Sequence, residues 1–250
     1  MKFHTSGNEF GNTIVLIHGM LNPWQIWEDV SVAFSKEHYI IIPELDAHTQ
    51  DERSDFISVE DEAKKIQEYM VQNHREELYM ICGLSMGGRI AAVLAGMPGI
   101  TAKYLVLDGA PLLPLPKPVR WFMTKSYMSI IRNSQTRDPR VIERFKKDFL
   151  PERYLDDFLQ LVDHIDEQSV KNILHSVCSP FEYKRYDDSC KILFMHGTRG
   201  NESISRQAAI RMKEVNPQTQ IKCLDGYAHA QLLSFEPSKW IEEVKGFMSD

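Results

Sequence analysis

A serine flanked by glycines stands near the middle of the chain, in Gly83-Leu84-Ser85-Met86-Gly87. An apolar stretch precedes it and an Ala-rich stretch follows, so the serine is expected at a turn from a strand to a helix. A sharp turn of this kind exposes the hydroxyl, and small residues two positions before and after let strand and helix meet. The N-terminus of the helix offers N–H groups to an oxyanion forming beside the serine. The pattern therefore predicts a nucleophilic serine.

The elements that must position this serine alternate between strands and helices. Strands are expected at residues 13–17, 39–43, 78–82, 104–108, 191–197 and 220–224, mostly as continuous apolar runs typical of buried strands. Helices are expected at 23–34, 58–72, from 86 onward, at 204–215 and at 237–248, with Ser58 as an N-terminal cap. This alternation predicts an α/β fold with a mostly parallel sheet and helices on both faces.

Residues 111–189 interrupt the alternation, since they show a proline-rich entry, helical stretches and no clear strand. The segment is too long for an ordinary loop, so it is expected as a helical cap inserted into a core of residues 1–110 and 190–250. Residues 117–148 are basic and residues 152–167 are acidic. These charges are either solvated helix faces that partly pair with each other, or a basic surface that attracts an acidic substrate.

The composition of the chain excludes several classes of binding partner. The formal net charge of −6 argues against nucleic acid or an anionic membrane, and no apolar run approaches the length of a membrane helix. The first eight residues lack the apolar core of a secretory signal, and the four cysteines are scattered as for reduced thiols. A cytoplasmic location is expected. No Cys/His cluster has metal-ligand spacing, so neither metal nor cofactor is expected.

Three features together resemble the α/β-hydrolase fold family. They are the turn at Gly83–Gly87, the sequence His18-Gly19-Met20 after an early strand, and Gly226-Tyr227-Ala228-His229 near the end. The resemblance spans nearly the whole chain, with residues 111–189 as the variable part, and it implies the α/β-hydrolase fold.

The resemblance also implies roles for individual residues. Ser85 is the expected nucleophile, and His229 is the expected base that takes its proton and later protonates the leaving group. The backbone N–H groups of Met20 and Met86 are the expected oxyanion hole. His18 is expected to pack and hydrogen-bond in its turn rather than to transfer protons.

The acid is where the sequence departs from the family, which orders its triad as nucleophile, acid and histidine. An Asp usually stands three residues after the glycine that ends the penultimate strand. That glycine is Gly197 here, and the matching position is Gly200. Two candidates remain: Asp108, which ends the strand after the serine unit, and Glu202, which lies in the expected loop but two residues late. Asp108 is favoured over Glu202.

The activity that the resemblance implies is cleavage of a small or medium acyl ester by a serine hydrolase, through an acyl-enzyme intermediate. One alternative uses the same triad for C–C hydrolysis or elimination on a carboxylated substrate, as the basic segment suggests. A second is a non-catalytic binding module, suggested by the missing Asp at Gly200. A set of aromatic and methionine residues either lines an acyl pocket or forms plain core: Trp24, Trp27, Trp121, Phe122, Met123 and Met128.

Overall fold

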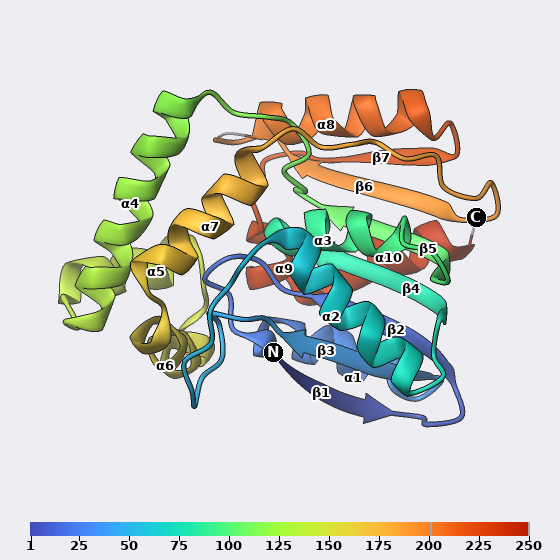
Figure 1. The fold of residues 1–250 in the computed structure, drawn as a ribbon, viewed down its shortest axis with the longest axis horizontal. Coiled ribbons are helices and arrows are strands. Elements are labelled where there is room, and N and C mark those ends of the chain that lie inside the picture. Colours follow the sequence, from blue (N-terminus) through green and yellow to red (C-terminus); the bar gives the residue numbers. More distant parts are fainter. Residues whose placement is uncertain (201, 250) are drawn as a thin grey trace.

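A mostly parallel sheet forms the centre of the computed structural model, which describes residues 1–200 and 202–249 (Figure 1). Within these residues the seven strands have the order β1-β3-β2-β4-β5-β6-β7, and only β1 runs antiparallel to its neighbour. They are β1 (Lys2–Gly7), β2 (Asn12–Ile17), β3 (His38–Glu44), β4 (Glu77–Leu84), β5 (Thr101–Asp108), β6 (Lys191–Gly197) and β7 (Thr219–Leu224). The predicted α/β sheet is confirmed, whereas the edge strand β1 was not predicted.

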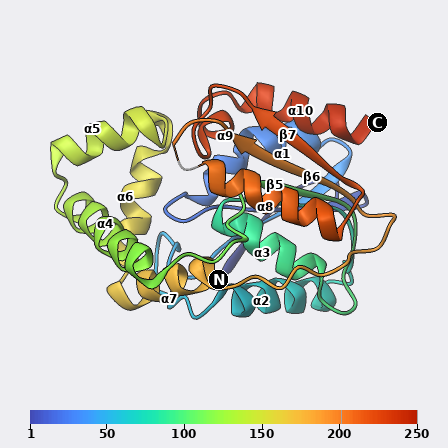
Figure 2. The same ribbon diagram turned by 90° about the horizontal axis from the view of Figure 1, so that it is seen from above.

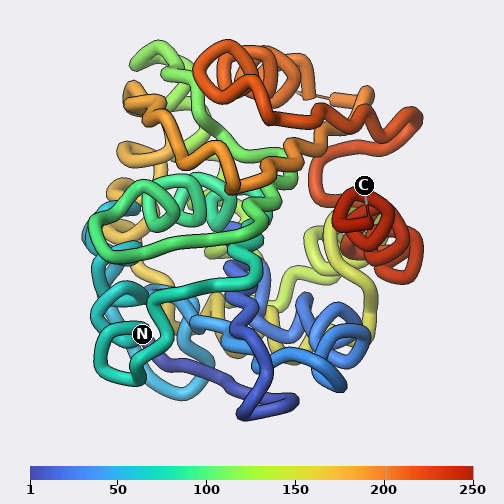
Figure 3. The backbone as a smooth tube through the Cα atoms, turned by 90° about the vertical axis from the view of Figure 1, so that its right-hand side faces the viewer, coloured from blue at the N-terminus to red at the C-terminus, as the bar shows by residue number. Residues whose placement is uncertain are grey.

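Helices cover both faces of the sheet. Figure 2 shows α1 (Glu28–Phe34) and α10 (Pro237–Ser249) on one side, and α2 (Val59–Gln72), α3 (Met86–Ala95) and α8 (Glu202–Val215) on the other. The same two layers flank the strands in Figure 3. The short helices η1 (Trp24–Trp27) and α9 (Gln231–Phe235) complete this part of the chain. None of the described helices is both long and apolar enough to cross a bilayer.

The inner strands are buried on both faces, as their continuous apolar sequences require. Residues 14–17 of β2 and 105–107 of β5 are fully shielded from solvent. The expected cap of α2 is confirmed, because the Ser58 side chain accepts the N–H of Asp61 at 3.0 Å. Parallel pairing sets Leu84 beside Asp108 and Asp108 beside Met195. The carboxyl ends of β4, β5 and β6 therefore meet at one edge of the sheet.

The helices of residues 111–189, a segment here called the helical insertion, lie beyond that edge, and the residues after them run back along α3 to the start of β6 (Figure 1). They contain α4 (Lys117–Gln135), α5 (Pro139–Asp148), η2 (Glu152–Tyr154), α6 (Leu155–His164) and α7 (Glu167–Cys178), and no strand. Part of the basic stretch pairs with the acidic one, as in the ion pairs Arg137–Asp163 at 2.7 Å and Lys146–Glu152 at 2.8 Å. The interpretation of mutually paired helix faces therefore holds for these residues.

Arg89, in the helix that follows the predicted nucleophile, joins the insertion to the core. Its buried guanidinium donates to the carbonyl oxygens of Pro111, Val177, Ser179 and Pro180 at 2.9–3.4 Å. Burial lowers the pKa of Arg89 from its ordinary value, yet the group stays cationic. Four carbonyl dipoles thus stabilise the buried charge, and both ends of the insertion are held by one side chain.

The two connections of the insertion also bond to each other. The Leu115 N–H donates to the Cys178 carbonyl at 2.9 Å, and the Tyr183 hydroxyl donates to the Leu112 carbonyl at 2.9 Å. The chain therefore leaves and re-enters the core at a single place, above the N-terminal half of α3.

We predict that Arg89→Met lowers the free energy of unfolding by about 3 kcal/mol, because it removes charge-assisted hydrogen bonds and leaves buried carbonyls without donors. Chemical denaturation measures this loss, and limited proteolysis should cut faster at residues 111–116 and 179–190. Arg140→Met is the matched control, since Arg140 is an exposed arginine of the same insertion. Equal stability of the two variants would show that Arg89 does not hold the insertion.

Candidate active site

Ser85 lies between β4 and α3 in a strained backbone conformation, with φ 52° and ψ −119°. A non-glycine residue in this region costs on the order of 1–3 kcal/mol, which the surroundings must offset. The Ser85 N–H donates to the Asp108 carbonyl at 2.7 Å, a bond between the ends of β4 and β5. The predicted sharp turn is therefore present, and it turns the chain directly into α3.

The two glycines around Ser85 are required by close backbone contacts. A Cβ added to Gly83 would lie 2.2 Å from the Gly87 oxygen, and one added to Gly87 would lie 2.2 Å from the Ile17 oxygen. Any side chain at either position would push β2, β4 and α3 apart. The sequence argument for small residues two positions on either side of the serine is thus met by the geometry.

His229 lies between Ser85 and Glu202. The Ser85 hydroxyl donates to His229 Nε2 at 2.8 Å, and His229 Nδ1–H donates to Glu202 Oε1 at 2.6 Å. Because Glu202 accepts the proton on Nδ1, the neutral ring presents Nε2 as an acceptor to the serine. This is the orientation in which a histidine can take the serine proton.

Glu202 is the first residue of α8, and its side chain is almost completely buried. Its second oxygen, Oε2, accepts the backbone N–H of Gly197 at 2.8 Å. Burial raises the pKa of Glu202, but the His229 hydrogen bond and charge together with the Gly197 N–H outweigh it and hold the pKa below the ordinary value of 4.5. Glu202 is therefore a carboxylate at neutral pH.

The His229 side chain is 42% exposed, so the end of the ring that faces Ser85 opens to solvent. Burial lowers the pKa of His229, but the Glu202 hydrogen bond and the charges of Glu202 and Asp108 raise it by more. The pKa is therefore shifted upward from its ordinary value of 6.5. The carboxylates stabilise the imidazolium, which is the form that the ring takes after accepting a proton.

The turn at residues 18–20 lies directly beside Ser85. A Cβ added to Gly19 would lie 3.3 Å from the Ser85 Cβ. Met86 is the first residue of α3, so its N–H has no acceptor within the helix. The two predicted oxyanion donors, the N–H groups of Met20 and Met86, thus belong to two segments that adjoin Ser85.

Two buried histidines brace that turn. His18 Nδ1–H donates to the Gly19 carbonyl at 3.0 Å while Nε2 accepts the Leu45 N–H at 3.2 Å. His48 Nε2 accepts the N–H of Leu21, which has a left-handed φ of 61°. Burial lowers the pKa of His18 to about 3 and that of His48 to about 4, so both rings stay neutral. His18 has the expected hydrogen-bonding role, whereas no pattern in the sequence singled out His48.

Comparison with known proteins tests the fold. No family model matches the chain. A curated relative, described as an AB hydrolase superfamily protein of Gibberella zeae, is 26% identical over 123 residues. That match spans 45% of this chain and 44% of the relative's length.

Solved structures match over the whole length. A protein of Desulfitobacterium hafniense assigned to the alpha/beta hydrolase family has a TM-score of 0.77 at 22% identity, with 99% of this chain and 100% of that one covered. An esterase of Thermogutta terrifontis gives 0.73 at 15% identity (99% and 92% covered), and an enol-lactonase of Burkholderia xenovorans gives 0.73 at 14% (100% and 96%). The chain has the α/β-hydrolase fold.

Asp108 was favoured over Glu202 as the acid partner of His229, and this preference was wrong, because Asp108 makes no hydrogen bond to the His229 ring. The Asp108 carboxylate accepts the Trp240 indole N–H at 2.9 Å, and Glu202 is the carboxylate that bonds to His229. Burial raises the pKa of Asp108 to about 6. Asp108 therefore acts on His229 only through its charge, from a position fixed by helix α10.

The aromatic residues considered for an acyl pocket are dispersed in this α/β-hydrolase fold. Trp27 is fully buried and packs edge-on against Trp240, with ring centroids 5.5 Å apart, and Trp24 stacks on His4 at 3.9 Å. Trp121 and Phe122 are exposed on α4. Plain core is thus the correct interpretation for Trp27, and neither interpretation fits Trp121.

An acidic cluster elsewhere, formed by Asp46, Asp61 and Glu62, is already neutralised by amines. The Lys65 ammonium contacts all three carboxylates, at 2.6 Å from Asp61 and 3.5 Å from Glu62, and the Met1 ammonium pairs with Asp46. Burial and the Asp46 charge raise the pKa of Glu62 to about 8. This cluster is an ion-pair network, and no metal site is assigned to it.

Gly109 provides a test of how tightly His229 is positioned. Its φ is 62°, and an added Cβ would lie 2.6 Å from His229 Cε1. We predict that Gly109→Ala displaces the ring and lowers kcat/KM for an ester substrate about 100-fold, because roughly 1 Å of misplacement is enough for such a loss.

Gly99→Ala is the matched control for this prediction. Gly99 has a φ of 83° and nothing within 4 Å of an added Cβ, so this variant carries the backbone strain without the contact. It should lose about 1 kcal/mol of stability and keep its activity. Equal activity of the two alanine variants would show that the space beside His229 is not needed.

Proposed function

We propose that this protein is a serine hydrolase that cleaves small or medium acyl esters through an acyl-enzyme intermediate. The observation that carries the proposal is the chain of hydrogen bonds from Ser85 through His229 to Glu202, at 2.8 and 2.6 Å. The similar folds described as an esterase and an enol-lactonase support ester chemistry. The exposure of His229 supports entry of a substrate from solvent.

In the proposed reaction, Ser85 Oγ attacks the carbonyl carbon of the ester while His229 Nε2 takes the hydroxyl proton. Glu202 stabilises the imidazolium that forms. The N–H groups of Met20 and Met86 donate to the oxyanion, and each such donor is typically worth about 10²–10³ in rate. His229 then gives its proton to the departing alcohol, which leaves an acyl group on Ser85.

In the second half of the proposed reaction, water hydrolyses the acyl-enzyme. His229 takes a proton from a water molecule, whose oxygen attacks the acyl carbon, and the proton then returns to Ser85 as the carboxylic acid leaves. The neutral His18 and His48 keep the turn at residues 18–20 in place through both steps, because burial lowers their pKa values to about 3 and about 4 and leaves both rings uncharged at neutral pH.

The two alternative functions lose their supporting observations. The basic stretch at residues 117–148 suggested a carboxylated substrate, but part of it pairs with acidic side chains, and Lys117, Arg120 and Lys125 line a groove that contains no residue of the proposed triad. The binding-module hypothesis was based on the missing Asp at position 200, and Glu202 supplies a carboxylate to His229 instead.

We predict that the purified protein hydrolyses p-nitrophenyl acetate or butyrate and is labelled by a fluorophosphonate probe at Ser85. Ser85→Ala should abolish both, whereas Ser126→Ala, an exposed serine of α4, should leave both unchanged. Peptide mapping by mass spectrometry identifies the labelled residue. A folded wild-type protein that neither reacts with the probe nor cleaves these esters would refute the proposal.

We further predict that Glu202→Gln lowers turnover by up to about 10⁴, because each Glu202 oxygen accepts an N–H and an amide cannot accept at both positions. Asp108→Asn should cost less than about tenfold, since its amide oxygen can still accept the Trp240 N–H. Stopped-flow or steady-state esterase assays measure both. A larger loss for Asp108→Asn would reverse the assignment.

The pH profile gives an independent check of the same pair. Neutral His229 is the active base, so activity falls as the pH drops through the pKa of His229, which the carboxylates hold above 6.5. Glu202→Gln should move this acid limb to lower pH, and Asp108→Asn should move it by less.

A further inference from the structure

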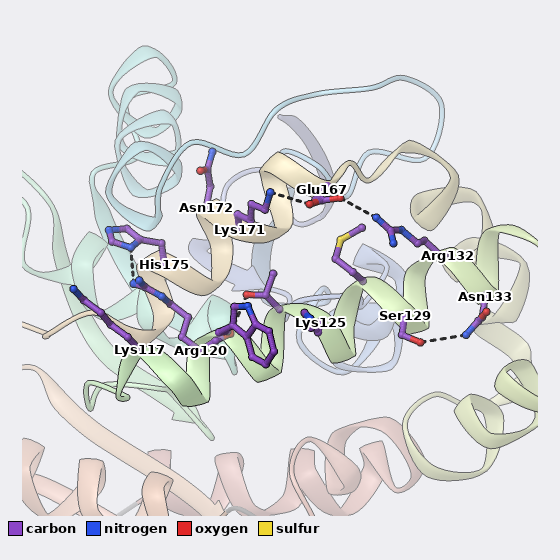
Figure 4. Close-up of a pocket in the computed structure, with 13 residues that line it drawn as sticks. Lys117, Arg120, Lys125, Ser129, Arg132, Asn133, Glu167, Lys171, Asn172 and His175 are labelled. Carbon is purple, nitrogen blue, oxygen red and sulfur yellow. Dashed lines mark hydrogen bonds and ion pairs between the residues drawn. The ribbon is translucent and has the colours of Figure 1, made fainter.

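A groove of about 920 Å³ runs between α4 and α7 in the helical insertion (Figure 4). All of its lining residues come from these two helices, and none belongs to the proposed triad. Arg120 meets His175 at one end, and Arg132 meets Glu167 at the other, so the helices are antiparallel along the groove. The groove is therefore separate from Ser85 and has two distinguishable ends.

The two ends of the groove differ in charge. At one end, the Glu167 carboxylate pairs with Arg132 at 2.9 Å and with Lys171 at 2.8 Å. Lys117 and Arg120 lie at the other end and Lys125 lies midway along α4, and none of these three has a carboxylate within 4 Å in the described part of the chain. Three positive charges thus remain uncompensated on a chain whose formal net charge is −6.

Two neighbouring side chains shape this cationic part of the groove. Arg120 donates to His175 Nδ1 at 2.7 Å, which orients the guanidinium without neutralising it. The Trp121 ring is 59% exposed, and Lys125 Nζ lies 4.0 Å from its centroid. Such a ring offers a flat apolar surface for a planar group of a ligand, next to cations for its charged groups.

We propose that the part of the groove lined by Lys117, Arg120 and Lys125 binds a compact anion that carries two or more phosphate or carboxylate groups. Lys117, Arg120 and Lys125 fall within nine consecutive residues of one helix, a span of about 12 Å, which matches a small molecule. The volume of the groove also lies in the range of small-molecule sites. The negative charge of the whole chain disfavours an extended polyanion such as nucleic acid or an anionic bilayer.

The proposal is tested by titrating pyrophosphate and citrate into the intact protein at low ionic strength, with isothermal calorimetry and tryptophan fluorescence as readouts. Both ligands should bind with a Kd below about 1 mM, whereas acetate should not bind, because a single charge engages only part of the cluster. Added salt should weaken binding. The relative affinities of the two ligands show whether phosphate or carboxylate is preferred.

Charge-removal variants locate the site. The triple change Lys117→Gln, Arg120→Gln and Lys125→Gln should raise Kd at least about tenfold, and Lys125→Gln alone should raise it by less. The matched control removes three charges from α5 instead, by Arg140→Gln, Arg144→Gln and Lys147→Gln, and should change Kd by less than about twofold. Circular dichroism verifies that each variant is folded.

Several outcomes would overturn the proposal. They are no binding of either polyanion up to about 5 mM, equal losses in the groove variant and the α5 variant, or binding to anionic vesicles in preference to the small anions. Ser85→Ala protein should bind as the wild type does, so failure of the proposed hydrolase activity would leave this test intact.

Discussion

The Glu202 carboxylate accepts two hydrogen bonds, from the His229 ring and from the Gly197 backbone, and the geometry of the candidate site depends on both. Gly197 ends β6, and His229 lies in the loop after β7, so one side chain connects two segments at the edge of the sheet. The N–H groups of Thr198 and Arg199 reinforce this by donating to the Tyr227 carbonyl at 3.0 and 3.1 Å. These bonds fix the position of the His229 ring relative to Ser85.

Asp108 supports the same site through two further hydrogen bonds. Its carbonyl accepts the Ser85 N–H and its carboxylate accepts the Trp240 N–H, so it connects the strained turn to the C-terminal helix α10. Trp240 and Trp27 are both fully buried and pack against each other. A buried tryptophan pair from both ends of the sequence thus packs behind Asp108, which in turn bonds to the Ser85 backbone.

Local patterns made much of this structure predictable. Continuous apolar runs marked the buried strands, and Gly83 and Gly87 marked the turn, because close backbone contacts allow no side chain there. The partner of His229 was not predictable in the same way. Whether Asp108 or Glu202 reaches the ring depends on Trp240, 132 residues from Asp108, and on the length of a glutamate side chain.

Other features also left no signal in the sequence. The strand β1 is a short, largely polar edge strand without the apolar run that marked the others. The role of His48 arises from a hydrogen bond to Leu21, 27 residues away, which no local pattern encodes.

The Arg89 guanidinium couples the helix that follows Ser85 to both connections of the helical insertion. Its four carbonyl acceptors belong to both connections, and Leu115 and Cys178 fasten those connections to each other. Other contacts also join the insertion to the core: Gln25 donates to Asp157 at 2.9 Å, and Asn172 donates to the Phe56 carbonyl at 2.9 Å. Because Arg89 lies about one helical turn after Ser85, the bonds that fix the connections of the insertion also fix the first turn of α3, to which the predicted oxyanion donor Met86 belongs.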